Sequence, residues 1–363
     1  MKIPYLDLKI EKNEKEALLE ILSDFFDRGR FVGGRDIEEY EQRLSNYFET
    51  SYIHGVASGN SALYLALKTL DLKNDDEVIV PNISWVATAH AVEISGGHCV
   101  FADVNDMLCV SVESIKKQIT NKTKAIIVVH FMGIPCEMDK IIELAELNNI
   151  KVIEDCSQAF GASYKDQKVG TFGDFGCFST NCMKVLAGVG DSGFLISKSE
   201  DAHKQIQPWL YNGVNEKKEI IDIELCHRLD PIQAVILSRR IDVIDKVILQ
   251  REVNGKAYLE KIKNLEIEFI PFDIQGERVF YGFTLVLSSP KKRELFIKYM
   301  MNNGIELKVE HEPCLSALAM YQSHRCESAN AQDYCKRIVN LPVSEVLSIE
   351  NLDYIIKTIN DWN

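Results

Sequence analysis

The sequence lacks the features that mark exported and membrane proteins. No stretch approaches the run of about 18 apolar residues that a transmembrane helix needs. The start, Met1 to Leu6, leads into a charged segment from Lys9 to Glu16, where a signal peptide would have its apolar core. The ten cysteines are scattered and form no Cys-x-x-Cys pair, which is typical of reduced thiols in a chain without an export signal. We therefore expect a cytoplasmic protein with no membrane partner.

An excess of positive charge is also absent. The chain has 41 Lys and Arg against 54 Asp and Glu, giving a formal net charge of -13. Such a balance argues against nucleic acid or an anionic membrane as the main partner, although it leaves room for a local basic pocket. One group of potential metal ligands, Cys177, Cys182, Cys226 and His227, fits no zinc-binding spacing. The sequence therefore predicts no metal site.

What is present is a regular alternation of short apolar runs with helical patterns. A chain of 363 residues suits a large domain and a smaller one. Alternating buried strands and helices predict a mostly parallel sheet covered on both faces. The expected strands are Ile53 to Ala57, Glu77 to Val80, Cys99 to Ala102, Ala125 to Val129, Lys151 to Glu154, Gly176 to Ser179 and Gly193 to Ile196. The helices expected between or before them are Ser61 to Leu72, Val86 to Ile94, Val112 to Ile119 and Met138 to Asn148.

The two ends of the chain follow other patterns. The first 50 residues indicate two amphipathic helices, broken around Gly29 to Gly34. After Asp230 we expect a long helical segment from Pro231 to about Lys263. A strand at Phe280 to Leu287, a helix at Lys291 to Asn303 and a closing helix from Ile349 follow. We predict an α/β fold with a large domain, residues 1–240, built on a seven-stranded sheet, and a small α+β domain, residues 241–363.

In open parallel sheets, ligands bind beyond the carboxyl ends of the strands. The first strand leads into Ser58-Gly59-Asn60-Ser61, a small-residue turn that opens a helix. Backbone N–H groups there favour a phosphate, while the alternative is an ordinary cap by Asn60 or Ser61. The turn lacks the Gly-x-x-x-x-Gly-Lys of a nucleotide-binding loop. Trp85, past the second strand, either stacks on a flat ring or belongs to the core.

The fifth and sixth strands contribute charged candidates. Asp155 ends the fifth strand. A carboxylate buried there needs a cation as its partner, and the alternative is that Asp155 caps the next segment. Lys184 lies in an apolar, glycine-flanked loop that can lower its pKa and make it an amine nucleophile, whereas a random Lys is a solvated surface residue. A phosphate cradle, an aromatic ring, a carboxylate and an amine are together the groups that pyridoxal 5'-phosphate (PLP) needs.

These residues resemble the DegT/StrS family of sugar aminotransferases, which have the aspartate-aminotransferase (type I) PLP-transferase fold. The resemblance spans nearly the whole chain and is strongest from Glu154 to Ala162, followed by Phe178-Ser179 and then Lys184 at the family's spacing. Val129-His130-Phe131-Met132-Gly133 and Leu341-Pro342-Val343 also match the family's motifs. The implied activity is transfer of an amino group from L-glutamate to a nucleotide-linked keto sugar, for amino-sugar and surface polysaccharide or antibiotic biosynthesis.

The resemblance implies a role for each matched residue. Lys184 would hold the cofactor as a Schiff base and move the proton during catalysis, and Asp155 would keep the pyridine nitrogen protonated. Gln158 would form a hydrogen bond with the ring hydroxyl oxygen, and Trp85 would stack on the ring. The cofactor phosphate would be held by Asn60, Ser61 and Ser179.

A homodimer with shared active sites is also implied, with residues 29–34 and the segment around residue 226 reaching the partner subunit. The chain departs from the family where Cys226 replaces an Asn that contacts the partner's cofactor phosphate. A thiol is a weaker hydrogen-bonding group, so this change puts cofactor affinity in question.

Three alternatives remain open on the sequence. A sugar dehydratase of the same family has His in place of the Schiff-base Lys, and Lys184 argues against that reading. A non-catalytic PLP-binding regulator is disfavoured by the intact Lys and by the acidic charge. A type I enzyme acting on an amino acid, such as a desulfurase, would not depend on glutamate. Lys308, Glu310 and His311 lie where family members contact substrate, and His130 is either structural or catalytic.

Overall fold

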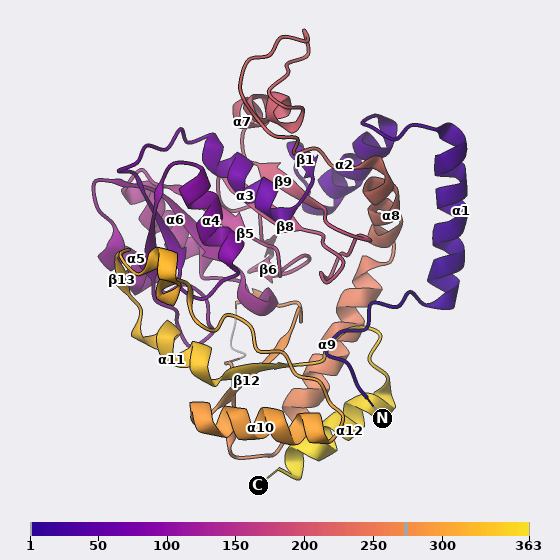
Figure 1. Cartoon of the computed structure of the whole chain (residues 1–363), viewed down its shortest axis with the longest axis vertical. Coiled ribbons are helices and arrows are strands. Elements are labelled where there is room, and N and C mark those ends of the chain that lie inside the picture. Colours follow the sequence, from indigo (N-terminus) through magenta and orange to yellow (C-terminus); the bar gives the residue numbers. More distant parts are fainter. Residues whose placement is uncertain (1, 272–274, 363) are drawn as a thin grey trace.

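The centre of the molecule is an eight-stranded sheet with the strand order β1-β9-β8-β5-β4-β2-β3-β13 (Figure 1). The computed structural model describes residues 2–271 and 275–362, so Met1 and Asn363, the outer ends of the two expected domains, lie outside it. Strand β9 runs antiparallel to both its neighbours, and all other pairings are parallel. The strands are β1 (Ile53–Val56), β2 (Glu77–Pro81), β3 (His98–Ala102), β4 (Thr123–Val129), β5 (Lys151–Asp155), β8 (Phe175–Ser179), β9 (Gly193–Ser197) and β13 (Cys326–Glu327).

This sheet confirms the expected α/β class with its mostly parallel order. All seven expected strands are present, and their ends differ from the expected ones by at most two residues. The eighth, β13, was not expected, because two residues far along the chain carry no strand pattern of their own. It pairs with the edge strand β3, Cys326 beside Phe101.

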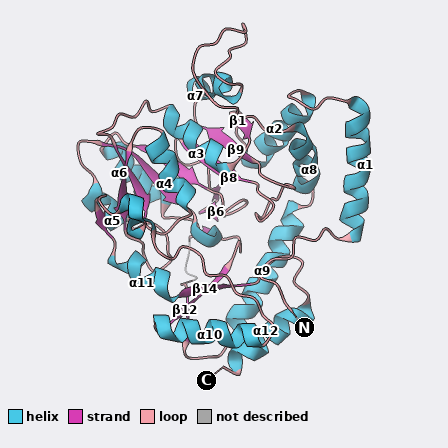
Figure 2. Ribbon diagram, in the orientation of Figure 1, coloured by secondary structure: helices cyan, strands magenta, loops and turns pink. Residues whose placement is uncertain are grey.

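Alternate residues of the strands supply two different cores. In β2, Val78 and Val80 pack with α3 (Gly59–Lys68) and α4 (Val86–Ile94) on one face. Ile79 packs on the other face with α5 (Val112–Gln118) and α6 (Met138–Leu147). Side chains of a strand alternate between the faces, so apolar residues at every position require helices on both sides. Figure 2 shows the helices lying around the strands.

The N-terminal helices are α1 (Lys12–Arg28) and α2 (Arg35–Phe48). The expected break between them is confirmed. Gly29 ends α1 with a φ of 61°, the left-handed conformation that glycine adopts without a Cβ clash. Helix α2 packs against α8 (Pro231–Ile241). The expected helical segment from Pro231 to about Lys263 is two helices, because the chain leaves the helix at Asp242 and Val243 before α9 (Ile244–Lys261) begins.

The later part of the chain forms a second, antiparallel sheet with the order β10-β12-β14. Its strands are β10 (Ile267–Phe269), β12 (Phe283–Leu287) and β14 (Ile338–Leu341), so the strand expected from Phe280 begins three residues later. Their side chains share one apolar cluster with α9, α10 (Pro290–Asn302) and α12 (Ile349–Asn360). Ile3 also belongs to this cluster and pairs with Ile305.

Several short elements link the two parts of the chain. Strand β11 (Gly276–Glu277) pairs with β6 (Ser163–Tyr164), which pairs with β7 (Gln167–Lys168). Helix α7 (Glu200–Ile206) follows β9, and α11 (Ala329–Arg337) follows β13. Strands from after residue 240 pair with strands from before it, and Ile3 pairs with Ile305 in the later part. The division into domains after residue 240 therefore stays a prediction. In the described part of the chain, no helix combines the length and the apolar character required to cross a bilayer.

Candidate active site

Asp155 lies at the carboxyl end of β5 and is 5% exposed. Its Oδ2 accepts a hydrogen bond of 2.9 Å from the Thr88 hydroxyl, and its Oδ1 accepts one of 3.1 Å from the Ser157 backbone. The Thr88 hydroxyl also lies 2.7 Å from that of Ser84, which precedes the N-cap Trp85 of α4. Sequence reasoning did not select Thr88, although a threonine in the first turn of a helix that starts at this sheet edge was a usable signal.

Lys184 lies in the loop between β8 and β9, and its ammonium group is 4.7 Å from the centre of the Tyr281 ring. Loss of water around the side chain lowers the pKa of Lys184 below its usual value. The carboxylates of Asp155 and Glu310 act in the opposite direction, and Lys308 lowers the pKa further. A lowered pKa raises the fraction of neutral amine, which is the nucleophilic form.

The Lys184 loop is held from behind by α8. The Gln233 amide oxygen accepts a hydrogen bond of 2.9 Å from the backbone N–H of Val189, and the Arg240 guanidinium donates to the carbonyls of Ala187 and Gly188. A Cβ at Gly188 would come within 2.6 Å of the Gln233 amide oxygen. The glycine therefore allows the loop to lie directly on α8.

Gln158 is buried, and the orientation of its amide is fixed by the backbone. Its Oε1 accepts a hydrogen bond of 2.7 Å from the N–H of Met132. Because a backbone N–H can only donate, the amide oxygen must face Met132. The amide NH₂ therefore points away from Met132, which is the arrangement that its expected role as a donor to the cofactor requires.

The expected phosphate cradle lies at the start of α3. A Cβ placed on Gly59 would lie 2.8 Å from Cβ of Ser179 and 3.2 Å from Oγ of Ser157, so only glycine allows this close approach. Gly59 and Asn60 are the first residues of the helix, and N–H groups at this position have no partner within the helix. The N–H of Ser61 donates to Oγ of Ser58 at 3.1 Å. Of the expected phosphate ligands, Asn60 and Ser179 are therefore the better placed.

Trp85 immediately precedes α4 and is 64% exposed. The alternative that it is a core residue is thereby excluded. Its neighbour Ser84 belongs to the hydrogen-bonded group of Thr88 and Asp155. Stacking of Trp85 on a ligand ring stays a prediction.

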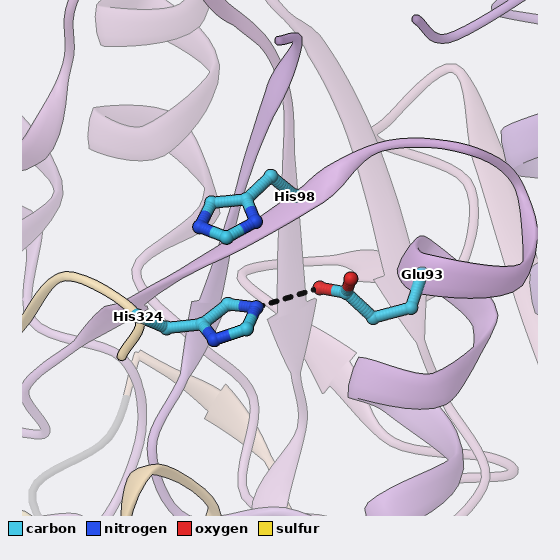
Figure 3. A group of neighbouring side chains, drawn as sticks. All are labelled: Glu93, His98 and His324. Carbon is cyan, nitrogen blue, oxygen red and sulfur yellow. Dashed lines mark hydrogen bonds and ion pairs between the residues drawn. The ribbon is translucent and has the colours of Figure 1, made fainter. Parts of the chain in front are cut away.

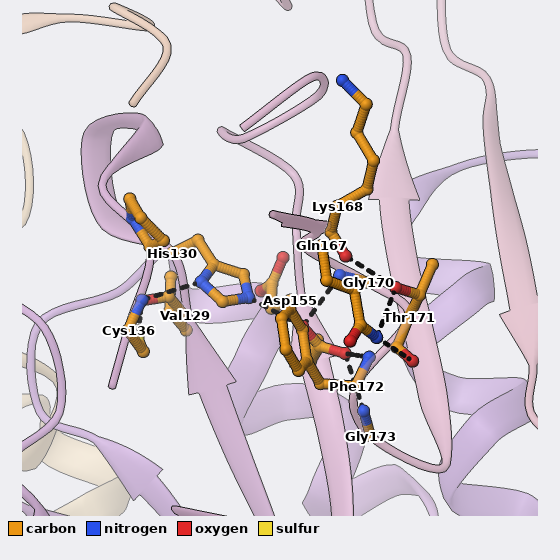
Figure 4. A network of polar contacts seen from close by, with 12 residues as sticks. Val129, His130, Cys136, Asp155, Gln167, Lys168, Gly170, Thr171, Phe172 and Gly173 are labelled. Carbon is orange, nitrogen blue, oxygen red and sulfur yellow. Dashed lines mark hydrogen bonds and ion pairs between the residues drawn. The ribbon is translucent and has the colours of Figure 1, made fainter. Parts of the chain in front are cut away.

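A buried polar network lies behind Asp155 and contains His130 (Figure 4). The N–H of Cys136 donates to His130 Nδ1 at 3.1 Å, so the ring proton is on Nε2, which donates to Glu154 Oε2 at 3.0 Å. The Glu154 carboxylate also accepts hydrogen bonds from the N–H groups of Gly170, Phe172 and Gly173, at 2.7 to 2.8 Å. The partners of both side chains lie within the protein, which identifies His130 as a structural residue.

The segment around Cys226 is fixed to α3. Lys68 forms ion pairs with Asp222 and Glu224, and Tyr64 donates to Glu224. His227 lies 3.1 Å from the Ser61 hydroxyl and 3.2 Å from Glu224. Cys226 itself is exposed.

Lys308 and Glu310 form an ion pair of 2.7 Å. Glu310 influences the pKa values of Lys184, Tyr281 and His311, which places its carboxylate near all three. Burial is the main cause of the lowered pKa of His311. A cavity of 380 Å³ adjoins Lys184 and includes Leu6, Arg251 and Glu345 in its lining.

The sequence matches the model of the DegT/DnrJ/EryC1/StrS aminotransferase family over residues 10–360. The chain belongs to this family. It is similar to dTDP-3-amino-3,6-dideoxy-alpha-D-galactopyranose transaminase of Aneurinibacillus thermoaerophilus, with 30% identity over 99% of both chains. It is equally similar to GDP-perosamine synthase of Escherichia coli O157:H7, with 30% identity over 99% of this chain and 98% of the relative. The crystal structure of NtdA from Bacillus subtilis with bound cofactor PMP superimposes with a TM-score of 0.92 and 25% identity, over 99% of this chain and 84% of that one.

The chain is thus a sugar aminotransferase that depends on PLP. The site fits that cofactor: it offers a buried carboxylate, an amine of lowered pKa, an amide with its NH₂ directed away from its backbone partner, and a cradle with no room for a Cβ at Gly59. The assignment of a role to each of these residues stays a prediction.

Proposed function

We propose that the enzyme transfers an amino group from L-glutamate to a keto sugar linked to a nucleoside diphosphate. The observation that carries the proposal is the pair of Lys184 and Asp155, an amine of lowered pKa under the direct electrostatic influence of a buried carboxylate. The names of the two relatives at 30% identity, one a dTDP-sugar transaminase and one a GDP-sugar synthase, support a nucleotide-linked substrate. The product would enter amino-sugar biosynthesis.

PLP, when bound, supplies an electron sink for the carbon that gains or loses the amino group. In our proposal Lys184 would hold the cofactor, and its Nζ would move a proton during the transfer. Asp155 would hold the ring nitrogen, and the Thr88 hydroxyl orients the Asp155 carboxylate for this task. The Gln158 NH₂ and Trp85 would bind the ring. The N-terminus of α3 and the Ser179 hydroxyl would bind the phosphate.

We further propose that the active enzyme is a homodimer. The segment from Ile220 to Leu225, which Lys68 of α3 holds through Asp222 and Glu224, exposes large apolar side chains. The exposed fractions are 79% for Ile220, 57% for Ile221, 96% for Ile223 and 72% for Leu225. Exposed apolar side chains grouped in this way indicate a protein interface. Phe31 and Val32, in the loop expected to reach the partner, are likewise more than half exposed.

We propose the cytoplasm as the site of action. The ten cysteines are all free, and the structure pairs none of them in a disulfide. This is the state expected in a reducing compartment.

The experiment that tests the function is the absorption spectrum of the purified protein before and after addition of L-glutamate. We expect a visible band that decays with glutamate and returns with an accepting keto sugar, tested with dTDP-, GDP- and UDP-linked compounds. Lys184→Ala should abolish both the band and turnover. If the band does not change with glutamate but decays with another amino acid, that amino acid is the donor. A protein that binds the cofactor but shows no turnover with any donor would favour the regulator. Loss of a sugar hydroxyl without amination would favour the dehydratase.

A further inference from the structure

Three side chains from distant parts of the chain meet at the edge of the large sheet, apart from the residues assigned to the cofactor. Glu93 lies in the last turn of α4, His98 is the first residue of β3, and His324 lies two residues before β13. The two imidazole rings are stacked with centroids 4.0 Å apart and an angle of 13° between their planes. His324 Nε2 lies 3.1 Å from Glu93 Oε1. Figure 3 shows the carboxylate beside the stacked rings.

We propose that Glu93, His98 and His324 bind a divalent first-row transition-metal ion. One ligand atom from each side chain lies within 4.8 Å of the other two, so the three side chains would meet at one ion once the His98 ring tilts out of the stack. Two imidazoles and one carboxylate, without a thiolate, form a ligand set typical of Zn²⁺, Co²⁺ or Ni²⁺, whereas Mg²⁺ and Ca²⁺ prefer oxygen alone. The Glu93 side chain is 34% exposed, which gives the ion access and leaves positions for water ligands.

Two of the three ligands, Glu93 and His324, are held in place before an ion arrives. Glu93 Oε1 accepts a hydrogen bond of 3.0 Å from the backbone N–H of Cys99. The His324 side chain is only 8% exposed and packs edge-on against the ring of Tyr321, with centroids 5.2 Å apart. The backbone N–H of Phe101 donates to the carbonyl of Arg325 at 3.0 Å, which fixes the position of His324 beside β3. A site with ordered ligands loses little conformational entropy on binding.

The group differs from the second cluster of potential ligands in the described residues, His130, Glu154 and Cys156, because the Glu93 carboxylate is open to solvent. That cluster is wholly buried, and its carboxylate is already occupied by His130 and three backbone N–H groups.

The consequence of binding would be a cross-link. The ion would join the turn before β13, the start of β3 and the end of α4, and so fasten the later segment to the edge of the large sheet. An ion that binds only the folded protein raises the unfolding temperature by mass action. The site should therefore affect stability and leave the rate of amino transfer unchanged.

The proposal is tested by equilibrium dialysis of the chelator-treated holoenzyme against Co²⁺. Wild-type protein should bind one more Co²⁺ per chain than the double variant His98→Ala/His324→Ala, and Co²⁺ should raise the unfolding temperature of the wild type alone. Binding at the ten thiols and at the cofactor persists in the variant and is subtracted. Loss of outer-shell partners alone weakens metal sites about 10- to 100-fold, so loss of one ligand in Glu93→Gln should cost at least about 10-fold.

The matched control is His203→Ala. His203 is also stacked on a second histidine, His54, with centroids 3.8 Å apart, but the pair belongs to neither three-ligand group of the described residues. It should bind Co²⁺ like the wild type. Equal Co²⁺ content in wild type and double variant, or an equal loss in His203→Ala, would overturn the proposal. If the double variant does not fold, Glu93→Gln at the half-exposed position carries the same comparison.

Discussion

The backbone N–H of Met132 and the side-chain oxygen of Gln158 are joined by a hydrogen bond of 2.7 Å. The bond fixes which end of the amide faces the cofactor site. It also makes Gln158→Glu a sharp test, because a carboxylate still accepts from Met132 but has no N–H to donate.

We expect Gln158→Glu to fold normally and to bind PLP about tenfold more weakly or worse, because a hydrogen bond to a charged group contributes roughly 1.5–3 kcal/mol. Titration of the apoenzyme with PLP, followed by the visible band, measures the loss. Gln167→Glu, at an exposed position, is the control and should bind like the wild type. Unchanged affinity in Gln158→Glu would remove Gln158 from the cofactor site.

Glu154→Gln should destabilise the protein. The amide would direct an NH₂ group at backbone N–H donors, leaving buried groups unsatisfied at a cost of about 3 kcal/mol. The apparent unfolding temperature should fall by roughly 4 °C. Glu137→Gln, which breaks a surface pair with Lys140, should change it by far less. Equal unfolding temperatures for the two variants would mean that the buried network does not stabilise the fold.

The pH dependence of cofactor attachment should respond to Glu310 and Lys308 in opposite directions. Glu310 raises the pKa of Lys184 and Lys308 lowers it. Neutral amine is the reactive form, so Glu310→Gln should move the acid limb of the attachment rate to lower pH, and Lys308→Gln should move it to higher pH. Stopped-flow mixing of apoenzyme with PLP across a pH series measures both. Shifts of the same sign would show that the two side chains act through the structure and not through charge.

Cys226→Asn should tighten PLP binding in the dimer by about tenfold, the effect of one added hydrogen bond to a charged phosphate. The present thiol is exposed and lies 2.8 Å from the Arg228 guanidinium. Cys226→Ala should leave affinity nearly unchanged. If both variants bind like the wild type, another group contacts the phosphate, or residue 226 does not reach the partner's site.

The sequence predicted the elements that depend on local pattern. Val78, Ile79 and Val80 are apolar in succession, which indicated a strand buried on both faces, and the helix from Val86 to Ile94 has the expected ends. Asp155 was selected because its burial at a strand end requires a cation, and Lys184 because its apolar, glycine-flanked loop can lower its pKa.

Features set by tertiary structure escaped prediction. Strand β13 has two residues, and its existence depends on the free edge of β3. The break at Asp242 and Val243 follows no glycine or proline signal. Thr88 bonds to Asp155, and Glu93 and His98 lie beside His324. No local sequence pattern predicts these contacts, because the partners are distant in the chain and meet only in the folded structure.

The pairing of β3 with β13 has a consequence for biosynthesis. Strand β3 leaves the ribosome long before its neighbour Cys326–Glu327, which follows it far along the chain. Until β13 emerges, the nascent sheet presents an unpaired parallel edge, the kind of surface that recruits other strands. The arrival of Cys326–Glu327 covers that edge and so removes it as a site of misassembly.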